Sequence, residues 1–442
     1  MNRKFYLPIL CVISGVWLLG CMSEDSHSLD PSEVFIKYYG SESEEQVIDM
    51  LPLSDGFLLL GSRTDVDNAD YYLVRTDSAG NRLWEGVINH DTVGSVDIPS
   101  KMYLDESNAA DPRLYIAGTS SFDRADDNLD KVPVDHLFLA SLSISPTGYS
   151  VIDTLVYRYS EVLSGVTTYY PTNGVDILGV EGEEELLVLA TVSSGSNDPT
   201  LDDKSILLMR LSSDFQNKDW ERKTGFGNDE IGKSLLNANG RYYYMAAVTT
   251  SSGVGNGGVD VLISEFDVVS GNEDNQMDYG TADNDEPANI IFTNPGIAVV
   301  GTTGSGSSQY AFILRVDSNL GSAQLRTLSY PKNSSGDLWN TQGYDLVQKT
   351  NGEFFVVGKV LSFTDENNDP REDEILLLPT DGIGEVYESK VQEYGSVQND
   401  VGNAILLKED GSMVIGATVH FGGSATMMSL MKTNRKGEFL RN

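Results

Sequence analysis

The chain has 442 residues, of which 30 are Lys or Arg and 66 are Asp or Glu, so its formal net charge is −36. A chain this acidic repels the phosphates of nucleic acids and the headgroups of anionic lipids, which excludes both as ligands. The only cysteines are Cys11 and Cys21, close to the N-terminus, so the rest of the chain has no thiol for a disulfide, a zinc site or a nucleophile. The fold must therefore be held by packing, which a chain of this length supports.

Residues 1–20 have the pattern of a secretory signal peptide. A basic start precedes an apolar run from Phe5 to Leu19, which is too short to span a bilayer core of about 30 Å comfortably. The run ends in Leu18-Leu19-Gly20-Cys21, which resembles the bacterial lipobox. The resemblance implies cleavage before Cys21 and attachment of lipid to its thiol. An ordinary secreted protein with a chance cysteine and an N-terminal membrane helix are the alternatives.

Residues 21–33 are polar and rich in serine, and we expect them to form a flexible tether after the lipidated cysteine. Glu24 and Asp25 follow that cysteine closely. The acidic pair resembles the export signal of Bacteroidetes lipoproteins. This implies an outer membrane lipoprotein displayed on the cell surface rather than held in the periplasmic leaflet. The membrane is then a partner through the lipid anchor, whose acyl chains contribute about 0.8 kcal/mol per buried CH₂.

A repeat with a period of about 57 residues fills residues 34–442. Its unit contains a short apolar run that ends in a small residue, and the small residues stand at positions 61, 118, 190, 247, 301, 358 and 416. Turn pairs such as Asn351-Gly352 precede most runs, and a third strand, a second turn and a weaker fourth strand follow. Seven copies of four antiparallel strands predict an all-β fold, a seven-bladed β-propeller. A β-solenoid or a two-domain sandwich would not give this period with seven matched copies.

The chemistry of the strands indicates which of them are buried. The second and third strands of each unit are apolar with little alternation, as in sheets that are covered on both faces, whereas the fourth mixes apolar and polar residues. The small residue predicts a close approach of two backbones. Residues 34–40 have the pattern of a fourth strand although they open the repeat region. We therefore predict that this N-terminal strand pairs beside the C-terminal strands and closes the ring.

The last unit contains Tyr394-Gly395-Ser396, Asn399-Asp400, Ala404-Ile405, Asp410-Gly411 and Gly416-Ala417-Thr418. In this order the residues resemble the signature of the bacterial seven-bladed β-propeller repeat family, and the Tyr-Gly opening recurs at residues 39–40 and 279–280. The resemblance covers residues 33–442 and departs from the family in the second and third units, which lack that opening. It implies the propeller fold and no activity, because such propellers are mostly scaffold or binding modules.

The order of the strands places the second-to-third loops and the links between units on one face, and most of the length variation is there. Long loops on a rigid scaffold are where binding usually occurs. These loops are acidic and the links contain aromatic residues, so we predict a binding face for a protein or a glycan. Its candidate residues are Asp123, Asp126, Asp127, Tyr169, Tyr170, Asp202, Asp203, Trp339, Asp365, Asp369 and Asp373.

Each of these residue types also has a plainer explanation. The carboxylates are the oxygen ligands that Ca²⁺ prefers, but none has the spacing of an EF-hand loop, and most are accounted for as solvated loop charges. Bound Ca²⁺ therefore stays an alternative, no metal ligand is assigned, and no other cofactor is predicted. The aromatic rings could stack on sugars, or they could simply cover the edges of the blades.

No catalytic pattern occurs in the sequence. There is no H-E-x-x-H, G-x-S-x-G or P-loop motif, and the histidines His27, His90, His136 and His420 are far apart. We therefore predict a non-enzymatic cell-envelope lipoprotein that acts as a binding or scaffold module. The alternative is a glycan-active hydrolase or lyase that uses carboxylates in the central funnel, and a structural lipoprotein without a small ligand is a third interpretation.

Overall fold

The computed structural model describes residues 34–439, except 42, 66–67, 91–94, 109, 123–133, 194–202, 226–228, 251–257, 307, 332–337, 365–369, 397 and 423–424. The predicted signal peptide, Cys21 and the tether lie outside these ranges. Within them all regular structure is β-strand except one 3-10 turn, η1 (Glu388–Lys390). No helix in the described ranges is long and apolar enough to cross a bilayer.

The strands form four-stranded antiparallel sheets, which we number 1 to 7 along the chain. Sheet 1 contains β2 (Glu44–Leu53), β3 (Gly56–Asp65), β4 (Asn68–Asp77) and β5 (Arg82–Ile88), and sheet 2 contains β6 (Val96–Asp105), β7 (Arg113–Phe122), β8 (Val134–Ser145) and β9 (Gly148–Tyr157). Sheet 3 contains β12 (Thr172–Gly179), β13 (Glu185–Ser193), β14 (Lys204–Ser212) and β15 (Lys218–Thr224), and sheet 4 contains β16 (Glu230–Asn237), β17 (Tyr242–Thr249), β18 (Asp260–Asp267) and β19 (Asn272–Tyr279). Sheet 5 contains β20 (Asp285–Phe292), β21 (Ile297–Ser305), β22 (Ser308–Val316) and β23 (Ala323–Leu328), and sheet 6 contains β24 (Thr341–Gln348), β25 (Phe354–Val360), β28 (Glu374–Thr380) and β29 (Gln392–Tyr394). Sheet 7 contains β30 (Val401–Leu407), β31 (Met413–His420), β32 (Thr426–Thr433) and β1 (Phe35–Tyr39).

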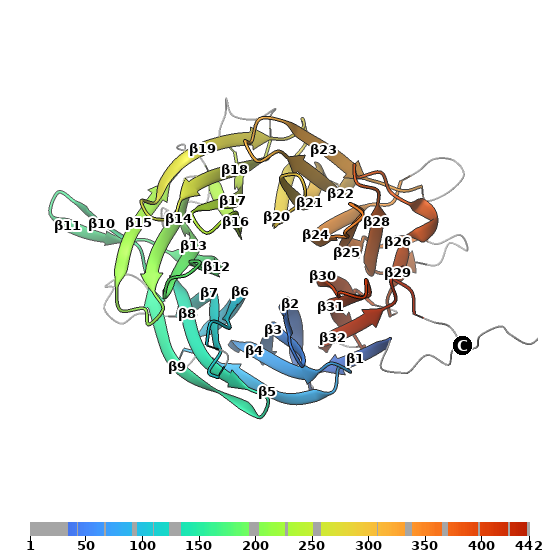
Figure 1. Cartoon of the computed structure of the whole chain (residues 1–442), viewed down its shortest axis with the longest axis horizontal. Helices are drawn as coiled ribbons and strands as arrows, with labels where there is room; N and C mark the ends of the chain where they lie inside the picture. Colours follow the sequence, from blue (N-terminus) through green and yellow to red (C-terminus); the bar gives the residue numbers. More distant parts are fainter. Residues whose placement is uncertain are drawn as a thin grey trace, which may run out of the picture.

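Two short hairpins complete the described strands: β10 (Ser160–Leu163) with β11 (Val166–Tyr169), and β26 (Phe363–Thr364) with β27 (Pro370–Arg371). Sheets 1 and 2 are continuous only through one parallel bridge between Ala69 and Val96. Figure 1 shows the sheets arranged around a central opening, with the first strand of each sheet nearest to it. The predicted all-β class and the four-stranded antiparallel sheets are confirmed.

The N-terminal and C-terminal strands share one sheet. β1 pairs antiparallel with β32 from Phe35 opposite Lys432 to Tyr39 opposite Met428. The segment that opens the described chain is therefore the outermost strand of sheet 7, beside the last three strands (Figure 1). The predicted pairing is confirmed, and it covers the edge of β32 that would otherwise be free.

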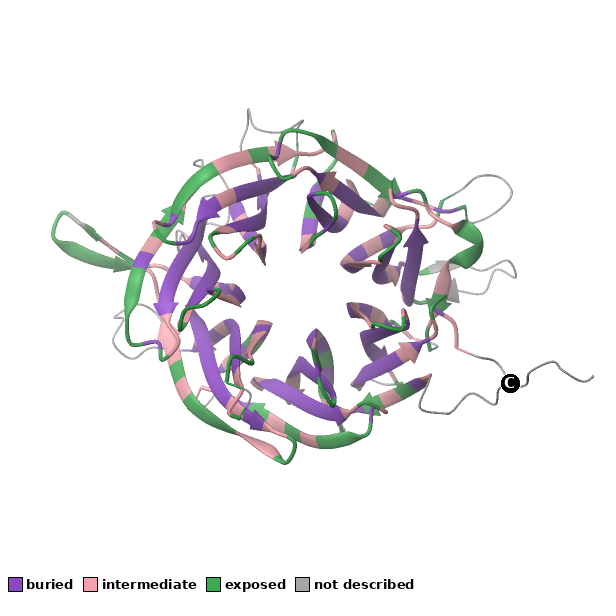
Figure 2. Cartoon of the chain, in the orientation of Figure 1, coloured by how far each residue is buried: buried purple, intermediate pink, exposed green. Residues whose placement is uncertain are grey.

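The middle strands of the sheets are buried on both faces. Leu58, Leu59 and Leu60 are consecutive on β3, so they point alternately to the two faces, and all three have no exposed surface. Leu58 and Leu60 pack in the cluster between sheets 1 and 2, whereas Leu59 packs in the cluster between sheets 7 and 1. Each such side chain contributes roughly 1.5–3 kcal/mol on burial. The outer strands are largely exposed (Figure 2).

A β-bulge lies at the same place in every first strand, and the pair of residues just before it always contains a glycine. The pairs are Val47–Gly61, Pro99–Gly118, Gly174–Ala190, Gly232–Ala247, Pro287–Gly301, Gly343–Gly358 and Gly402–Ala417. A Cβ on Gly301 would lie 2.1 Å from the carbonyl oxygen of Glu286, so this approach of the backbones requires glycine. The close approach predicted from the small residues is confirmed, with one correction, because the register in sheet 7 places Ala417 rather than Gly416 at the equivalent position.

Hydroxyl groups join several neighbouring sheets at the same level. The side-chain oxygens of Thr119, Thr191 and Thr418 accept the backbone N–H groups of Gly174 (3.2 Å), Gly232 (3.2 Å) and Val47 (3.0 Å) in the next sheet. The equivalent residues between sheets 4 and 5 are Val248 and Pro287. Because valine has no acceptor and proline has no N–H, this interface leaves no polar group unpaired at that place.

Candidate functional site

Six polar side chains from the first strands meet around the axis of the molecule, and we call them the inner ring. They are Asp49, Lys101, Asp176, Ser234, Asn289 and Asp345, one from each of sheets 1 to 6, and each directly follows the bulge of its strand. Sheet 7 has Ala404 at this position. The equivalent positions in the repeat bring residues that are far apart in sequence to one level of the opening.

The carboxylates of the inner ring hold neighbouring sheets together. Each accepts a backbone N–H from the following sheet: Met102 donates to Asp49 (3.1 Å), Leu235 to Asp176 (2.7 Å) and Ile405 to Asp345 (2.8 Å). These bonds join sheets 1 and 2, sheets 3 and 4, and sheets 6 and 7. Hydrogen bonds from N–H groups to carboxylates are stronger than those between neutral partners, so these carboxylates stabilise the contacts between neighbouring sheets.

Neutral side chains from sheets 4 and 5 continue the ring as far as Asp345 of sheet 6. The Ser234 hydroxyl donates to the Asn289 side-chain oxygen at 2.8 Å. The Asn289 side-chain nitrogen in turn donates to Asp345 Oδ1 at 2.6 Å. The amide of Asn289 thus accepts with its oxygen and donates with one of its two N–H groups within the ring.

Lys101 is the one cation of the inner ring, and its Nζ donates to Asp49 Oδ1 at 2.9 Å. Burial alone would lower the pKa of Lys101, but the carboxylates of Asp49, Asp345 and Asp176 outweigh it and raise the pKa. Burial raises the pKa of Asp176 to about 6, although Lys101 and two backbone N–H groups favour its charged form. Burial likewise raises the pKa of Asp345. The side chains of the ring thus bond one another and backbone N–H groups, and its carboxylates serve the packing of the sheets.

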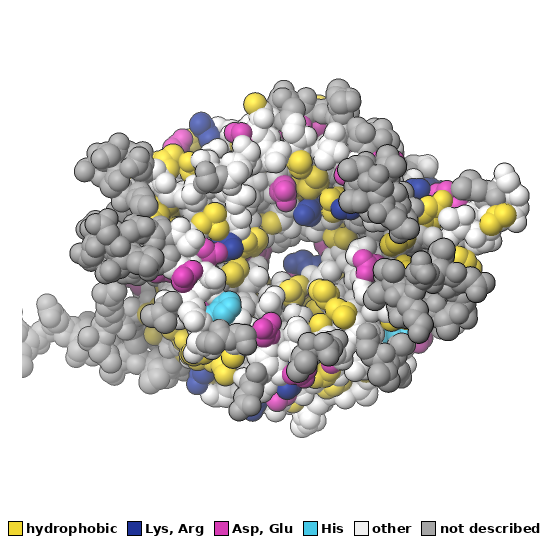
Figure 3. Space-filling model, turned by 180° about the vertical axis from the view of Figure 1, so that it is seen from behind, with side chains coloured by type: hydrophobic (Ala, Val, Ile, Leu, Met, Phe, Trp, Pro, Cys, Tyr) yellow, Lys and Arg dark blue, Asp and Glu magenta, His cyan; other side chains and the backbone are white. Residues whose placement is uncertain are grey.

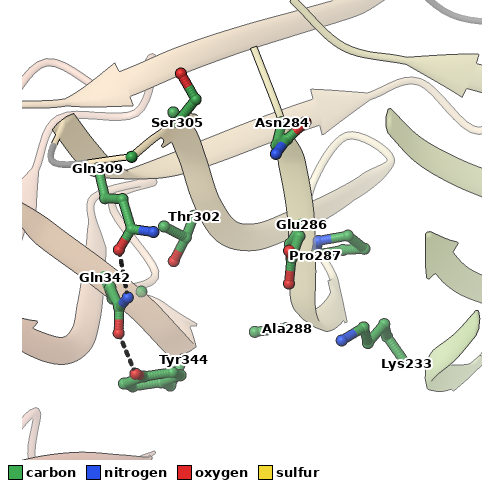
Figure 4. Close-up of a pocket in the computed structure, with 13 residues that line it drawn as sticks. Lys233, Asn284, Glu286, Pro287, Ala288, Thr302, Ser305, Gln309, Gln342 and Tyr344 are labelled. Atoms are coloured by element: carbon green, nitrogen blue, oxygen red, sulfur yellow. Dashed lines mark hydrogen bonds between the residues drawn. The ribbon is translucent and has the colours of Figure 1, made fainter. Parts of the chain in front are cut away.

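A polar pocket of about 480 Å³ opens beside the inner ring, where β20 begins and β21 ends, and we call it the mouth pocket. Its walls come from sheets 4, 5 and 6 and include Lys233, Glu286, Gln309, Gln342 and Tyr344 (Figure 4). Figure 3, seen from behind, shows charged side chains of both signs and hydrophobic side chains around the central opening. The connection between β21 and β22 lines the pocket, so it belongs to the face with the second-to-third loops.

Three side chains of the mouth pocket form a chain of hydrogen bonds. The Tyr344 hydroxyl donates to Gln342 Oε1, and Gln342 Nε2 donates to Gln309 Oε1 at 2.6 Å (Figure 4). Burial raises the pKa of Tyr344 to about 12, and the charge of Asp373 acts in the same direction. Tyr344 is therefore a neutral hydroxyl at physiological pH, able to donate or accept a hydrogen bond.

Lys233 and Glu286 contribute the charges of the mouth pocket. Lys233 is half-buried on β16, and Glu286 is exposed on β20. Within the ranges that the structure describes, neither side chain makes a hydrogen bond or an ion pair. Both side chains can therefore bind a ligand, whereas the charged groups of the inner ring already bond one another or the backbone.

The structure describes only some of the residues predicted for the binding face. Outside the described residues lie Asp123, Asp126, Asp127, Asp202, Asp365 and Asp369. Asp203 is exposed, and Asp373 accepts Lys359 Nζ and the backbone N–H of Ser362, both at 2.7 Å. Neither of these two lines the mouth pocket.

The predicted aromatic residues lie in the links between sheets. Tyr169 is 50% exposed at the end of the β10–β11 hairpin, which projects outside the ring of sheets (Figure 1), and the Arg158 guanidinium lies 4.9 Å from the centre of its ring. The ring of Tyr170 lies 5.9 Å from that of Tyr159. Trp339 is half-buried, with its ring 6.4 Å from that of Tyr330. None of the three predicted aromatic residues lines the mouth pocket.

Sequence reasoning missed the pocket, although a signal for it exists. Every first strand contains a triplet whose middle residue precedes the bulge, and three of these triplets are Ile231-Gly232-Lys233, Glu286-Pro287-Ala288 and Gln342-Gly343-Tyr344. Aligning the repeats on the middle residue would have placed the flanking residues at one level of the opening. Their meeting in one pocket depends on the neighbouring positions of sheets 4, 5 and 6.

No group of three or more His, Cys, Asp or Glu is placed to hold a metal ion in the described part of the chain. His136 is buried there, with its ring stacked on that of Phe122 at a distance of 4.3 Å between ring centres. Most of the acidic loop residues that were considered as Ca²⁺ ligands lie outside the described residues, so bound Ca²⁺ stays an alternative.

No family model matches the chain, and no curated protein matches it. Among solved structures, an acylaminoacyl peptidase in complex with Z-Gly-Gly-Phe-chloromethyl ketone is similar at a TM-score of 0.47 and 8% identity, with 88% of this chain and 52% of that chain covered. The acylaminoacyl peptidase of Pyrococcus horikoshii in its orthorhombic crystal form is similar at a TM-score of 0.44 and 9% identity, covering 84% of this chain and 49% of that one. The chain spans about half the length of these structures.

These comparisons correct the predicted function. The sequence favoured a non-enzymatic binding or scaffold module, whereas the structures retrieved are those of enzymes, so that prediction is withdrawn. The physical reason is that repeated sheets fix a scaffold and say nothing about whether a site on it is catalytic. The peptidase activity of the retrieved proteins is theirs, and at 8–9% identity it is not carried over to this chain. The membership of the bacterial repeat family stays a prediction.

Proposed function

We propose that the chain is a seven-bladed β-propeller that binds a glycan in the mouth pocket and cleaves it. The arrangement of sheets 1 to 7 around one opening and the pairing of β1 with β32 support the propeller (Figure 1). The one bridge between sheets 1 and 2 is a local contact between two blades on this interpretation.

The mouth pocket is the observation that carries the functional part of this proposal. Its volume of about 480 Å³ lies within the range usual for small-ligand sites, roughly 300–1,000 Å³. Sugars present many hydroxyl groups, and the walls of the pocket offer amide, hydroxyl and carboxylate partners, namely Gln309, Gln342, Tyr344 and Glu286. A site built to pair with hydroxyl groups discriminates strongly against ligands that lack them.

Cleavage needs groups that exchange protons with the substrate. Glu286 supplies a carboxylate, and Tyr344 supplies a neutral hydroxyl whose single proton, donated to Gln342 in this structure, would turn to the substrate. Hydrolysis by two carboxylates would require a partner for Glu286 about 5–9 Å away, and Glu286 is the one carboxylate among the lining residues that the structure describes. Elimination is the other form of cleavage in this proposal: the acceptor removes a proton from a ring carbon, a C=C bond forms, the glycosidic C–O bond breaks, and the donor protonates the leaving oxygen.

The cellular setting is the second part of the proposal. Cleavage before Cys21 and lipidation of its thiol would anchor the protein to the outer membrane, with the mouth pocket and the predicted acidic face at the cell surface. Metabolic labelling with a fatty acid is expected to mark the wild-type chain but not Cys21→Ala. Equal labelling of both chains would contradict the anchor.

The proposal is tested with the purified full-length chain on a glycan array, followed by product analysis for each glycan bound. We expect binding to acidic or neutral polysaccharides and the appearance of shortened products. Glu286→Gln is expected to keep binding and to reduce cleavage by at least roughly 100-fold, since general acid–base groups contribute about that much. Glu409→Gln, an exposed change at a turn of sheet 7, is the matched control. Binding without any product would contradict cleavage, and no binding to any glycan would contradict the whole assignment.

A further inference from the structure

Lys233 has an ammonium group without a partner in the described part of the chain, and from this we infer that the ligand of the mouth pocket is an acidic sugar whose carboxylate pairs with Lys233. This inference rests on the proposed function and specifies its substrate class. Lys233 projects from β16 at the bulge of sheet 4 and lines the pocket opposite residues of sheets 5 and 6 (Figure 4).

The charge of the whole chain makes this lysine informative. With a net charge of −36, the protein as a whole repels anions and attracts cations. Lys101, the lysine of the inner ring, provides the contrast, because its ammonium pairs with Asp49 at 2.9 Å. Lys233 makes no ion pair or hydrogen bond within the described ranges, although it is half-buried and the chain has 66 acidic residues. An unpaired cation in a concave site is a natural partner for a ligand carboxylate.

The other lining groups suit the rest of a sugar ring. When ionised, Glu286 acts as a hydrogen-bond acceptor and not as a donor, which matches sugar hydroxyls as donors. Gln342 and Gln309 already bond each other at 2.6 Å, and the second amide nitrogen of that pair, on Gln309, has no partner within the described ranges. One cation for the carboxylate, with an acceptor and a donor for hydroxyl groups, is the set that a uronic acid residue requires.

The test compares uronic acid oligosaccharides with their methyl esters, which have the same length and stereochemistry but no charge. Oligomers of galacturonate, glucuronate and mannuronate are used as pairs of acid and ester, with the full-length chain, in titration calorimetry. We expect at least one acid form to bind roughly tenfold or more tightly than its ester, since a charge-assisted hydrogen bond contributes about that factor. Affinity for the acid form should fall as salt is raised.

Variants assign this preference to the lysine. Lys233→Met is expected to remove the preference for the acid form, and Lys233→Arg to retain it. Glu286→Gln is expected to tighten binding of the acid form, because it removes a like charge from the same pocket. Lys436→Met, an equal change of charge at an exposed C-terminal turn, is the matched control and should leave the preference unchanged.

The outcomes separate the inference from the proposed function. Equal binding of acid and ester, or a preference that survives in Lys233→Met, overturns the inference and leaves the glycan assignment standing. Binding of neutral glycans alone does the same. Failure of every acid and every ester to bind, together with an empty glycan array, overturns both.

Discussion

The inner ring and the mouth pocket lie at neighbouring levels of the same strands, yet they treat polar groups in opposite ways. In the inner ring, Asp176 accepts backbone N–H groups from two sheets, and Lys101 is bonded to Asp49. In the mouth pocket, Lys233 and Glu286 have no partner within the described ranges. A buried polar group must be paired inside the protein, whereas a polar group at the mouth of the opening needs no such partner and can bind a ligand.

The comparison separates stability from binding. Changes in the inner ring should cost stability and leave the ligand affinity of the folded chain unchanged. Changes in the mouth pocket should do the reverse. The following experiments measure the unfolding free energy of every variant and, for the pocket variant, its ligand affinity as well.

The largest effect is expected from Asp176→Ala. This carboxylate is 2% exposed, and its loss leaves the backbone N–H groups of Ile177 and Leu235 unpaired and Lys101 with less compensation. Removing one partner of a buried charged network costs roughly 3–5 kcal/mol. Urea denaturation is expected to show this loss, while Asp274→Ala on the exposed β19 should change the unfolding free energy by less than about 0.5 kcal/mol. A loss of unfolding free energy under about 1 kcal/mol for Asp176→Ala would show that the inner ring does not stabilise the contacts between sheets.

Titration of Asp176 should also make the unfolding free energy depend on pH. The folded-state pKa of Asp176 is about 6, above its ordinary value of 3.8. Between about pH 4 and 6 the folded chain therefore holds a proton that the unfolded chain has released, and the stability from this group is lost as pH rises through 6. The contribution is at most roughly 3 kcal/mol.

The measurement is the difference in unfolding free energy between wild type and Asp176→Asn at several pH values. The asparagine does not titrate, so this difference isolates the single group from the other carboxylates. We expect the advantage of the wild type to shrink from pH 4 to pH 7. A difference that is constant across that window would contradict the raised pKa.

A smaller effect on stability is expected at the hydroxyl contacts between sheets. Thr191→Val removes the acceptor of the buried Gly232 N–H, which should cost about 1–3 kcal/mol. Thr327→Val on the exposed β23 is the matched control, with an expected change under about 0.5 kcal/mol. Chemical denaturation measures both, and equal values for the two variants would mean that the contact between sheets contributes nothing.

The smallest effect is expected from Tyr344→Phe in the mouth pocket. It removes the hydroxyl that donates to Gln342, so the affinity for the bound glycan should fall roughly two- to tenfold. The unfolding free energy should change by less than about 1 kcal/mol. Tyr38→Phe on the outer strand β1 is the control, and calorimetry of both variants provides the comparison. A loss of stability without a loss of affinity would assign Tyr344 to the scaffold rather than to the pocket.

Local patterns were enough to predict most of the fold. Apolar runs, turn pairs and their period gave four-stranded sheets, and the strand-like residues 34–40 gave the pairing of β1 with β32. Both depend on backbone hydrogen bonding and burial, which the pattern of apolar residues reports directly. The prediction chose Gly416 where the register has Ala417. Local patterns fail here because a bulge shifts the register without changing the composition of the strand.

The candidate site depended on tertiary structure. Lys233, Glu286 and Tyr344 are separated by more than fifty residues at each step and share only their place beside the bulge. The acidic loop residues of the predicted binding face are clustered in sequence, whereas the mouth pocket is assembled from residues of three different sheets.

By itself, the sequence of this protein determined the repeat, the strand order and the strongly negative charge, since each of these is a property of neighbouring residues or of their sum. Tertiary structure decided which polar groups have partners within the described residues, as Lys101 has, and which have none there, as with Lys233. The reason is geometric: the partners of a side chain near the axis come from other sheets, and their distances are set by how the sheets pack.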